Sequence, residues 1–396
     1  MDNPLSRLAP QLFGEYPKPF IKLVDSILIG PDQEKDEIKT LLWKAYEFGN
    51  RHHEGQNRRS GEAYFTHCVA VAQTLATWKM DTTTIIAGLL HDTVEDTDVS
   101  VTALRQEFGD DLANLVDGVT KIGGIKFSTR KEKQAGNFMK MLLSVAQDLR
   151  VIIIKFADRL HNMETIKHMT KIKQHRIAVE TRDVYVPLAH RLGMSSVKSQ
   201  LEDLAFRVLD PAGYKALDSK IKSSKKQRDK FIKMIIGPVQ DELKTYDIIP
   251  HVYGRSKSYS SIYGKMVSRN KSFEEIYDLY AIRIIVDKIE QCYLALGIVH
   301  SLYTPIQERF KDFIATPKTN GYQSVHTTVL GSKGQLVEIQ IRTTEMEETA
   351  EIGVAAHWVY KDGKSSGIDQ NVKWLRELLD ILQNESADPK EFMELL

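Results

Sequence analysis

The sequence His91-Asp92-Thr93-Val94-Glu95-Asp96 directly follows the apolar run Ile85–Leu90. Side chains three and four positions apart share one face of a helix, so Asp92 is expected beside the two later acids. His91 would point about a quarter-turn away on the same helix. Such a helix edge could hold a cation and support metal-assisted hydrolysis. A solvated acidic helix end beside an ordinary histidine would have the same sequence, so the rest of the chain must decide.

Length and composition predict a two-domain globular protein. The 396 residues exceed what one hydrophobic core usually holds. Lys and Arg total 54 and Asp and Glu total 53, so a net charge of +1 gives no overall attraction to nucleic acid or membrane. Cys68 and Cys292 match no zinc or redox spacing, and no apolar run has the length of a signal peptide or membrane span. A reduced, cytoplasmic location is therefore expected.

Periodicity predicts mainly helices in the first half of the chain. Helices are expected over 34–50, 63–80, the stretch that carries His91 and Asp92, 101–116 and 134–147, with a loop over 118–130. The run Val151–Ile154 could start a buried strand, but its continuation through Leu160 favours a buried helix. Asp158 would be buried on that helix and would need a neutralising partner, which a metal ion would supply.

Two imidazoles and two carboxylates from three predicted helices form a candidate metal set: His67, His91, Asp92 and Asp158. Taken alone, His67 is better interpreted as a hydrogen-bonded core histidine than as a metal ligand. Mixed nitrogen and oxygen ligands without a thiolate suit Mn²⁺, Fe²⁺ or catalytic Zn²⁺ better than a structural zinc site. A bound cation lowers the pKa of its water toward ~7 and polarises a phosphoryl oxygen.

The second half of the chain has a different sequence pattern. Residues 200–233 are expected to be helical and rich in charge, with a basic surface made by Lys215, Lys220, Lys222, Lys225, Lys226, Arg228, Lys230 and Lys233. We interpret this surface as a solvated helical face, although RNA contact stays possible. From about Ile248 the segments become short and β-rich. The loop Val252–Ile262 combines glycine, bases and serines, which suits phosphate binding, but it lacks the Walker ending.

Two predicted strands carry acids that could meet. The strand over 336–342 alternates with period two, which puts Glu338, Gln340 and Arg342 on one face. A solvent-facing edge strand would show the same pattern. Asp278 belongs to the other strand, over 276–286, and two such carboxylates could share a Mg²⁺ that gathers triphosphate oxygens. In the turn over 316–326, Tyr322 could stack on a base or simply pack over the loop.

The first half resembles the HD-type hydrolase domain of the RelA/SpoT homologues, the (p)ppGpp synthetase/hydrolases. The resemblance is carried by His67, His91-Asp92, Glu95-Asp96 and Asp158-Arg-Leu-His-Asn162, with flanking matches over Gly55–Glu62 and Pro187–Met194. It implies a Mn²⁺ held by His67, His91, Asp92 and Asp158, with Glu95 and Asp96 activating the attacking water and Arg58 and Asn162 holding the nucleotide. The implied reaction removes pyrophosphate from the ribose 3′ position of ppGpp or pppGpp. Cys68, Gly136 and Met139 depart from the usual family residues, and none is an implied ligand.

The second half resembles the synthetase domain of the same family over about Tyr253–Lys361, most specifically over Lys311–His326. The implied fold is a nucleotidyltransferase-like mixed sheet flanked by helices, and the implied reaction transfers pyrophosphate from ATP to the 3′-hydroxyl of GDP or GTP. Carried over, Asp278 and Glu338 bind Mg²⁺, and Glu338 with Gln340 takes the proton from the hydroxyl. Phosphates are implied for Arg255, Lys257, Ser261, Lys311 and Lys318. Tyr322 would stack on guanine, Asn320 would help to place it, and His326 would contact the acceptor's phosphates.

These expectations combine into one hypothesis. The fold is α+β, with an all-α hydrolase domain over 1–200 and a synthetase domain with C-terminal helices over 201–396. Arg309-Phe-Lys-Asp312 resembles the bifunctional members of the family, which implies an enzyme of the stringent response that both makes and destroys (p)ppGpp. Ribosome or regulatory partners are expected through C-terminal domains absent from this chain, which would be the catalytic half. The alternatives are a member with one lapsed site and a non-catalytic sensor of guanine nucleotides.

Overall fold

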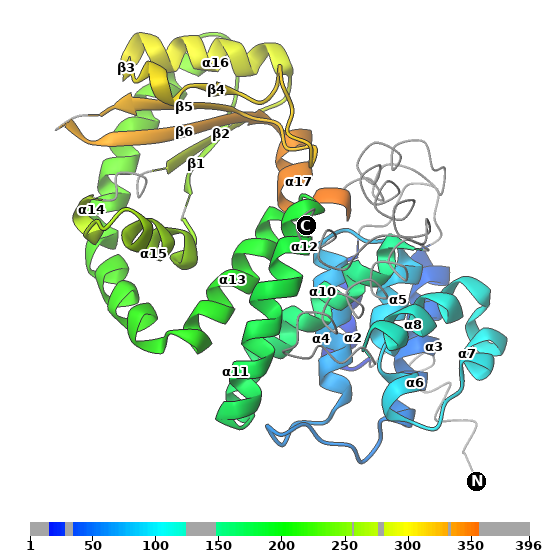
Figure 1. The fold of residues 1–396 in the computed structure, drawn as a ribbon. Helices are drawn as coiled ribbons and strands as arrows, with labels where there is room; N and C mark the ends of the chain where they lie inside the picture. The colour runs from blue at the N-terminus through cyan, green and yellow to red at the C-terminus, as the bar shows by residue number, and fades with distance from the viewer. Residues whose placement is uncertain are drawn as a thin grey trace, which may run out of the picture. The chain divides into compact units, whose positions relative to one another are not determined.

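The structure is a computed structural model, and it describes residues 16–27, 35–123, 148–255, 257–275, 281–331 and 334–355. These residues form two compact units, one over 16–169 and one over 170–355. Figure 1 shows that helices build the first unit and that the sheet belongs to the second. None of the described helices combines the length and the apolar character that crossing a membrane requires.

The first unit is helical in its described residues, apart from one isolated bridge between Asn57 and Ala63. Its helices are α2 (Lys18–Asp25), α3 (Lys35–His52), α4 (Phe65–Thr77), α5 (Thr82–Leu90), α6 (Thr93–Asp96), α7 (Val101–Phe108), α8 (Asp110–Gly123) and α10 (Leu149–Glu164), followed by the 3-10 turn η1 (Ile166–His168). The helix α4 packs against α5 and α10, and side chains such as Leu75, Ile86 and Phe156 are almost wholly buried.

The structure confirms the helices predicted over 34–50 and 63–80, and α10 confirms a buried helix rather than a strand after Val151. The single helix predicted over 101–116 is wrong. Gly109 has φ +88° and ψ 173°, a conformation open essentially to glycine, and it separates α7 from α8. The loop predicted from Gly118 is also wrong at its start, because α8 continues to Gly123. The rest of that loop and the helix predicted over 134–147, with Gly136 and Met139, lie outside the described residues.

The second unit begins with helices and continues into the sheet. Its helices are α11 (Lys171–Glu180), the π-helix η2 (Thr181–Tyr185), α12 (Val186–Arg191), α13 (Ser195–Leu209), α14 (Pro211–Lys244), α15 (Tyr259–Ser268), α16 (Ile289–Leu302) and α17 (Thr344–Ile352), with 3-10 turns η3 (Phe273–Glu275), η5 (Gln307–Arg309) and η7 (Gly353–Ala355). The predicted helical connector is confirmed but is divided at Asp210. The Asp210 side chain accepts a hydrogen bond from the Gly213 N–H (2.8 Å), and Pro211 occupies the first helical position.

The sheet is mixed, as predicted. Its strands are β1 (His251–Arg255), β2 (Ala281–Val286), β3 (Thr304–Pro305), β4 (Lys311–Asp312), β5 (Val325–Leu330) and β6 (Leu336–Thr343). They are ordered β1-β2-β6-β5-β3, with β4 paired to β5. The pair β2–β6 is parallel and the other pairs are antiparallel. Figure 1 shows α16 along one face of this sheet, where side chains from α14 and α16 complete the apolar core.

The position of β6 decides between two interpretations of its alternating sequence. The strand lies in the middle of the sheet, between β2 and β5. Its apolar side chains face the core formed with α14 and α16, and its polar side chains Gln340 and Arg342 are also buried. A solvent-facing edge strand is therefore excluded, and the polar face needs partners of its own.

Candidate active sites

The turn that carries His91 and Asp92 differs in one respect from the prediction. The helix α5 ends at Leu90, so His91 is its C-cap and Asp92 is the N-cap of α6. The prediction that both residues lie within one continuous helix is therefore wrong. The Asp96 N–H still donates to the Asp92 carbonyl oxygen (2.8 Å), so this single turn keeps Asp92 beside Glu95 and Asp96. Glu95 and Asp96 are exposed, whereas His91 and Asp92 are buried.

The structure brings the four predicted metal ligands together. Nε2 of His67 lies 3.3 Å from Asp158 Oδ1 and 3.5 Å from Asp92 Oδ2. Nε2 of His91 lies 3.1 Å from Asp92 Oδ1 and 3.9 Å from Asp158 Oδ1. Ligand atoms of His67, His91 and Asp158 all lie within 4.8 Å of one another. The helices α4, α5 and α10, which pack together in the core, thus present nitrogen and oxygen atoms to one point.

The hydrogen-bond partners of His67 and His161 indicate which ring nitrogen of each carries the proton. The Arg58 guanidinium, which can only donate, lies with Nη1 2.9 Å from Nδ1 of His161. That Nδ1 therefore accepts, and Nδ1 of His67, 2.7 Å away, must donate to it. Burial, followed by the charges of His67 and Arg58, lowers the pKa of His161 to about 4, which keeps the ring a neutral acceptor. Nε2 of His67 is left to face the two carboxylates with its lone pair.

A backbone carbonyl group orients the His91 ring in a similar way. Its Nδ1 lies 2.9 Å from the Gly88 carbonyl oxygen, which can only accept. Its Nε2 is buried and has no aligned hydrogen-bond partner, although Asp92 Oδ1 is close. Burial lowers the pKa of His91, but Asp92 and Asp158 outweigh it and raise the pKa to about 9. A proton or a cation is thus required between this nitrogen and the carboxylates, and the donor set fits a divalent metal ion.

A second layer of side chains surrounds these ligands. Lys155 Nζ lies 2.9 Å from Asp158 Oδ2, and the Asn162 amide donates to Asp158 Oδ1 (2.5 Å). Arg58 Nη2 donates to Asn162 Oδ1 (2.9 Å), so the two residues predicted to hold the nucleotide contact each other. Tyr64 Oη lies 2.8 Å from Asp92 Oδ2 and 2.6 Å from Asp96 Oδ2, which joins a predicted ligand to a predicted water-activating acid.

Tyr64, Lys155 and His161 were not among the site residues predicted from the sequence. Helical spacing offers a signal for the first two, because Tyr64 and Lys155 each stand three residues before a predicted ligand. His161 stands three residues after Asp158, but nothing in the sequence shows that its ring reaches α4.

The polar face of β6 forms the second candidate site. The Gln340 amide donates to Glu338 Oε1 (2.8 Å), and Arg255 Nη1 lies 3.5 Å from Gln340 Oε1. His326 stands opposite Gln340 in the β5–β6 ladder, with Nδ1 3.8 Å from Glu338 Oε1. Tyr322 Oη lies 2.8 Å from His326 Nε2. Five predicted site residues are therefore connected across β1, β5, β6 and the loop before β5.

The charges of this face are set by burial and by neighbouring groups. Burial raises the pKa of Glu338, but the hydrogen bond from Gln340 and the charge of Lys257 outweigh burial. The pKa is therefore lowered overall, and the carboxylate stays ionised. Burial lowers the pKa of His326 to about 4 despite the attraction of Glu338, so its ring is neutral at pH 7. A cavity of about 340 Å³ opens beside Tyr322 and is also lined by Arg255 and Lys257.

The remaining predicted residues lie around this face to different degrees. Lys318 Nζ lies 5.5 Å from the centre of the Tyr322 ring, and exposed Lys311 stands opposite His326 in the β4–β5 ladder. The Asn320 amide donates to the His190 carbonyl oxygen of α12 (3.2 Å) instead of facing Glu338. Ser261 lies on α15, and its hydroxyl accepts a hydrogen bond (2.6 Å) from the hydroxyl of Ser258, the N-cap of that helix. Asp278 lies outside the described residues.

Two charged residues near the second site, Lys265 and Arg283, were not predicted from the sequence, whereas Arg342 was predicted on the polar face of β6 but not as a buried residue. Burial, followed by the nearby charge of Lys257, lowers the pKa of Lys265 to about 8, and the charge of Glu338 also acts on it. Lys265 follows Ser261 by four residues on α15, a spacing that could have identified it. Arg283 Nη1 contacts Glu347 Oε1 (2.6 Å), and buried Arg342 also pairs with Glu347, which ties β2 and β6 to α17.

Comparisons with known proteins agree with both halves of this description. Residues 45–195 match the family described as "HD domain", and residues 254–365 match the family described as "Region found in RelA / SpoT proteins". The chain is 47% identical over 369 residues to a GTP pyrophosphokinase of Myxococcus xanthus, covering 92% of this chain and 48% of that protein. It is 45% identical over 363 residues to the bifunctional (p)ppGpp synthase/hydrolase SpoT of Escherichia coli K12, covering 91% of this chain and 51% of that protein.

A GTP pyrophosphokinase of Streptomyces coelicolor is 45% identical over 412 residues, covering 99% of this chain and 48% of that protein. The chain spans about half the length of these curated relatives. Its two family matches follow each other in the order of the two candidate sites, and its alignments run through both. The chain therefore belongs to the RelA/SpoT family.

Proposed function

We propose that this chain is a bifunctional alarmone enzyme that hydrolyses (p)ppGpp at the first candidate site and synthesises it at the second. The observation that carries the proposal is the presence of both clusters, the His67–His91–Asp92–Asp158 group and the Glu338–Gln340–His326–Tyr322 group, in one chain. The activity named for the E. coli relative, a bifunctional synthase/hydrolase, supports it.

In the hydrolase site, His67, His91, Asp92 and Asp158 would hold Mn²⁺, which when bound supplies an activated water and polarises a phosphoryl oxygen. Arg58 and Asn162, already in contact, bind the nucleotide. Asp96 and Glu95 stand exposed at the mouth of the site, where they take the proton of the attacking water. The oxygen of water forms a bond to the phosphorus that carries the ribose 3′ oxygen, while the bond between that phosphorus and the 3′ oxygen breaks. The 3′ oxygen takes up a proton, and the products are GDP or GTP plus pyrophosphate.

In the synthetase site, Tyr322 stacks on the acceptor guanine and Asn320 helps to place it. Phosphates are bound by the cations Arg255, Lys257, Lys311 and Lys318 and by the Ser261 hydroxyl, and neutral His326 contacts the acceptor's phosphates. Glu338 and Asp278 would hold Mg²⁺, which gathers the triphosphate oxygens of ATP.

The ionised Glu338, oriented by Gln340, accepts the proton of the 3′-hydroxyl. The 3′ oxygen forms a bond to the β-phosphorus of ATP while the bond between that phosphorus and the bridging α-β oxygen breaks, and AMP leaves. Fixed cations stabilise the charge that develops on the transferring group.

Several wider assignments are part of the same proposal. We assign hydrolysis to residues 1–200 and synthesis to residues 201–396, with cytoplasmic location. Contacts with the ribosome or with regulatory proteins would depend on further domains of the kind that make the relatives about twice as long.

Two assays on the purified chain test this function. In the first, ATP and GDP are supplied with Mg²⁺ and ppGpp is measured; in the second, ppGpp is supplied with Mn²⁺ and GDP is measured. Product in both assays is expected. Product in one assay only would indicate a member with one lapsed site, and no product in either, together with nucleotide binding, would indicate a non-catalytic sensor.

A further inference from the structure

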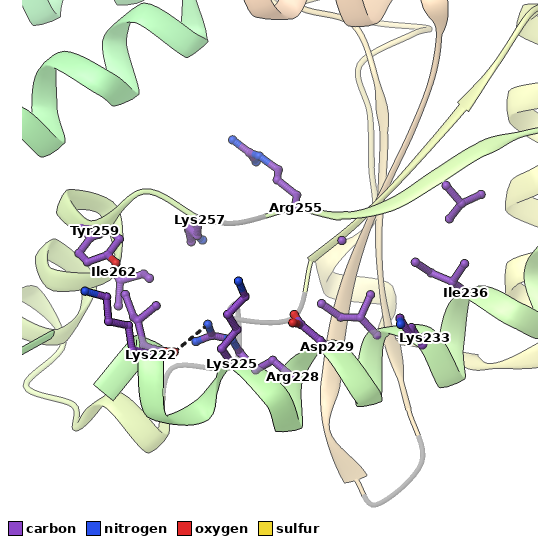
Figure 2. Close-up of a pocket in the computed structure, with 14 residues that line it drawn as sticks. Lys222, Lys225, Arg228, Asp229, Lys233, Ile236, Arg255, Lys257, Tyr259 and Ile262 are labelled. Carbon is purple, nitrogen blue, oxygen red and sulfur yellow. Dashed lines mark hydrogen bonds between the residues drawn. The ribbon is translucent and has the colours of Figure 1, made fainter. Parts of the chain in front are cut away.

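A second and larger cavity lies in the synthetase unit, next to the cavity beside Tyr322. It has a volume of about 670 Å³ and is bounded by α14, β1 and the start of α15. Figure 2 shows α14 along one side of it, with Arg255 and Lys257 on the other. Ligand pockets for small molecules typically have about 300–1,000 Å³. The space is thus large enough for a nucleotide.

The lining of this cavity is strongly cationic. The helix α14 supplies Lys222, Lys225, Arg228 and Lys233, and Arg255 and Lys257 stand at the opposite rim, against a single acid, Asp229. Lys222 pairs with Asp218 (2.7 Å), and Arg228 donates to its own helix. Among the described residues, Lys225 and Lys233 have no acidic partner. In a chain with a net charge of +1, this is a local excess that an anion would stabilise.

Apolar side chains form the rest of the wall. Ile221, Ile232 and Ile236 alternate with the cations along the same face of α14, and Val252 and Ile262 face them. At Gly254 the backbone of β1 packs so closely on α14 that a Cβ would lie 2.9 Å from Ile232 Cδ1. Apolar surface beside several cations matches the two parts of a nucleotide, a base and a polyphosphate.

The two cavities of this unit share one border. Arg255, Lys257 and Tyr259 line both the cavity against α14 and the smaller cavity beside Tyr322. A ligand in the larger cavity would therefore lie against the same residues that are proposed to bind phosphates during synthesis. Lys225, Lys226, Lys230 and Lys233 are all exposed on α14, but only Lys225 and Lys233 line the cavity.

We propose that the cavity between α14 and β1 binds a nucleoside polyphosphate, with its phosphates against Lys225 and Lys233 and its base against the isoleucines of α14. The inference rests on the proposed synthetase activity. The same chemistry has two sources, the donor ATP and the guanosine polyphosphate product. This proposal replaces the interpretation of the α14 surface as wholly solvated, because four of its cations, Lys222, Lys225, Arg228 and Lys233, line a cavity large enough for a nucleotide.

The test compares the double variant Lys225→Ala/Lys233→Ala with the matched control Lys226→Ala/Lys230→Ala on the same helix. Binding of a non-hydrolysable ATP analogue, and of ppGpp without Mn²⁺, is measured by equilibrium dialysis, and KM values for ATP and GDP are measured in synthesis. The cavity variant should bind one of the two nucleotides at least 5-fold more weakly, while the control stays within 2-fold of the wild type. A rise in the KM for ATP alone identifies the donor; loss of ppGpp binding with an unchanged KM for ATP identifies the product.

The proposal is overturned if both nucleotides bind the two double variants equally and thermal unfolding shows both to be folded. Weaker binding of a single-stranded RNA oligonucleotide, with both nucleotides unaffected, would also overturn it, because the cations of α14 would then serve a polymer. The dialysis measurement does not need catalysis. An inactive wild-type chain would therefore contradict the proposed function, whereas the dialysis measurement alone decides whether this cavity binds a nucleotide.

Discussion

The Nδ1 atom of His161 lies 2.7 Å from the Nδ1 atom of His67 and 2.9 Å from Nη1 of Arg58. One ring thus orients a predicted metal ligand and holds a residue predicted to bind the nucleotide. Outer hydrogen bonds of this kind fix the tautomer and the direction of a ligating imidazole. Binding of metal and binding of nucleotide are therefore expected to share one supporting residue.

Replacing His161 should weaken metal binding without unfolding the unit. His161→Ala removes the acceptor for the His67 N–H, and we expect Mn²⁺ affinity to fall ~10–100-fold. His161→Asn, whose amide oxygen can accept the same hydrogen bond, should recover part of that loss. Free Mn²⁺ measured by electron paramagnetic resonance during titration gives the affinity. Exposed His168 provides the control, and equal affinities for His161→Ala and His168→Ala would contradict the role of His161.

The two activities should be separable by single substitutions. Asp92→Ala is expected to reduce hydrolysis by at least ~100-fold and to spare synthesis, because Asp92 contacts both imidazoles of the first cluster. Glu338→Ala is expected to do the reverse. Both reactions are measured on each variant under the conditions of the two assays. A variant that loses both activities while remaining folded would mean that the sites are not independent.

Synthesis should depend on pH through Lys265. Its pKa is lowered to about 8, so the ammonium is charged below that pH and neutral above it. If Lys265 helps Lys257 to bind phosphates, the KM for ATP should rise between pH 7 and pH 9, roughly 5-fold for the loss of ~1 kcal/mol. Lys265→Arg keeps its charge over this range and should remove the rise. A rise of the same size in Lys265→Arg would assign the pH dependence to another group.

The break between α7 and α8 should be sensitive to any side chain. No atom lies within 4 Å of a Cβ built on Gly109, so Gly109→Ala tests backbone conformation alone, and we expect destabilisation of about 1–3 kcal/mol. Gly297→Ala is the comparison, because this glycine lies in open space within α16 and the change should stabilise that helix by about 0.5–1 kcal/mol. Hydrogen exchange in α8 and α16 reports each effect in its own unit. Unchanged exchange in α8 would show that the turn can relax.

Residue type and spacing predicted the candidate metal ligands of the first site and the polar face of β6, but not the contacts of these residues. His67, His91, Asp92 and Asp158 could be chosen because imidazoles and carboxylates after apolar helices need partners, yet only the packing of α4, α5 and α10 shows that they meet. The alternation in β6 identified the face of Glu338 and Gln340. It could not show that Arg342 is buried, because burial depends on which strands and helices stand beside β6.

Backbone conformation and tertiary contacts explain where the structure differs from the predictions. The sequence around Gly109 has helical periodicity on both sides, so the pattern continues through a residue whose positive φ ends one helix and allows the next. The apolar run before His91 and the spacing of Asp92, Glu95 and Asp96 fit one continuous helix, and the break at Leu90 became visible only from the structure. Asn320 contacts α12, a neighbour that no local pattern predicts.

The parallel pairing of β2 with β6 has a consequence for how the protein is made. This central pair joins segments far apart in the chain, so the second site cannot assemble until β6 has been translated. The proposed ligands of the first site are complete much earlier, once Asp158 has emerged. Since domains fold in order from the N-terminus during translation, each new molecule would gain the capacity to degrade the alarmone before the capacity to make it.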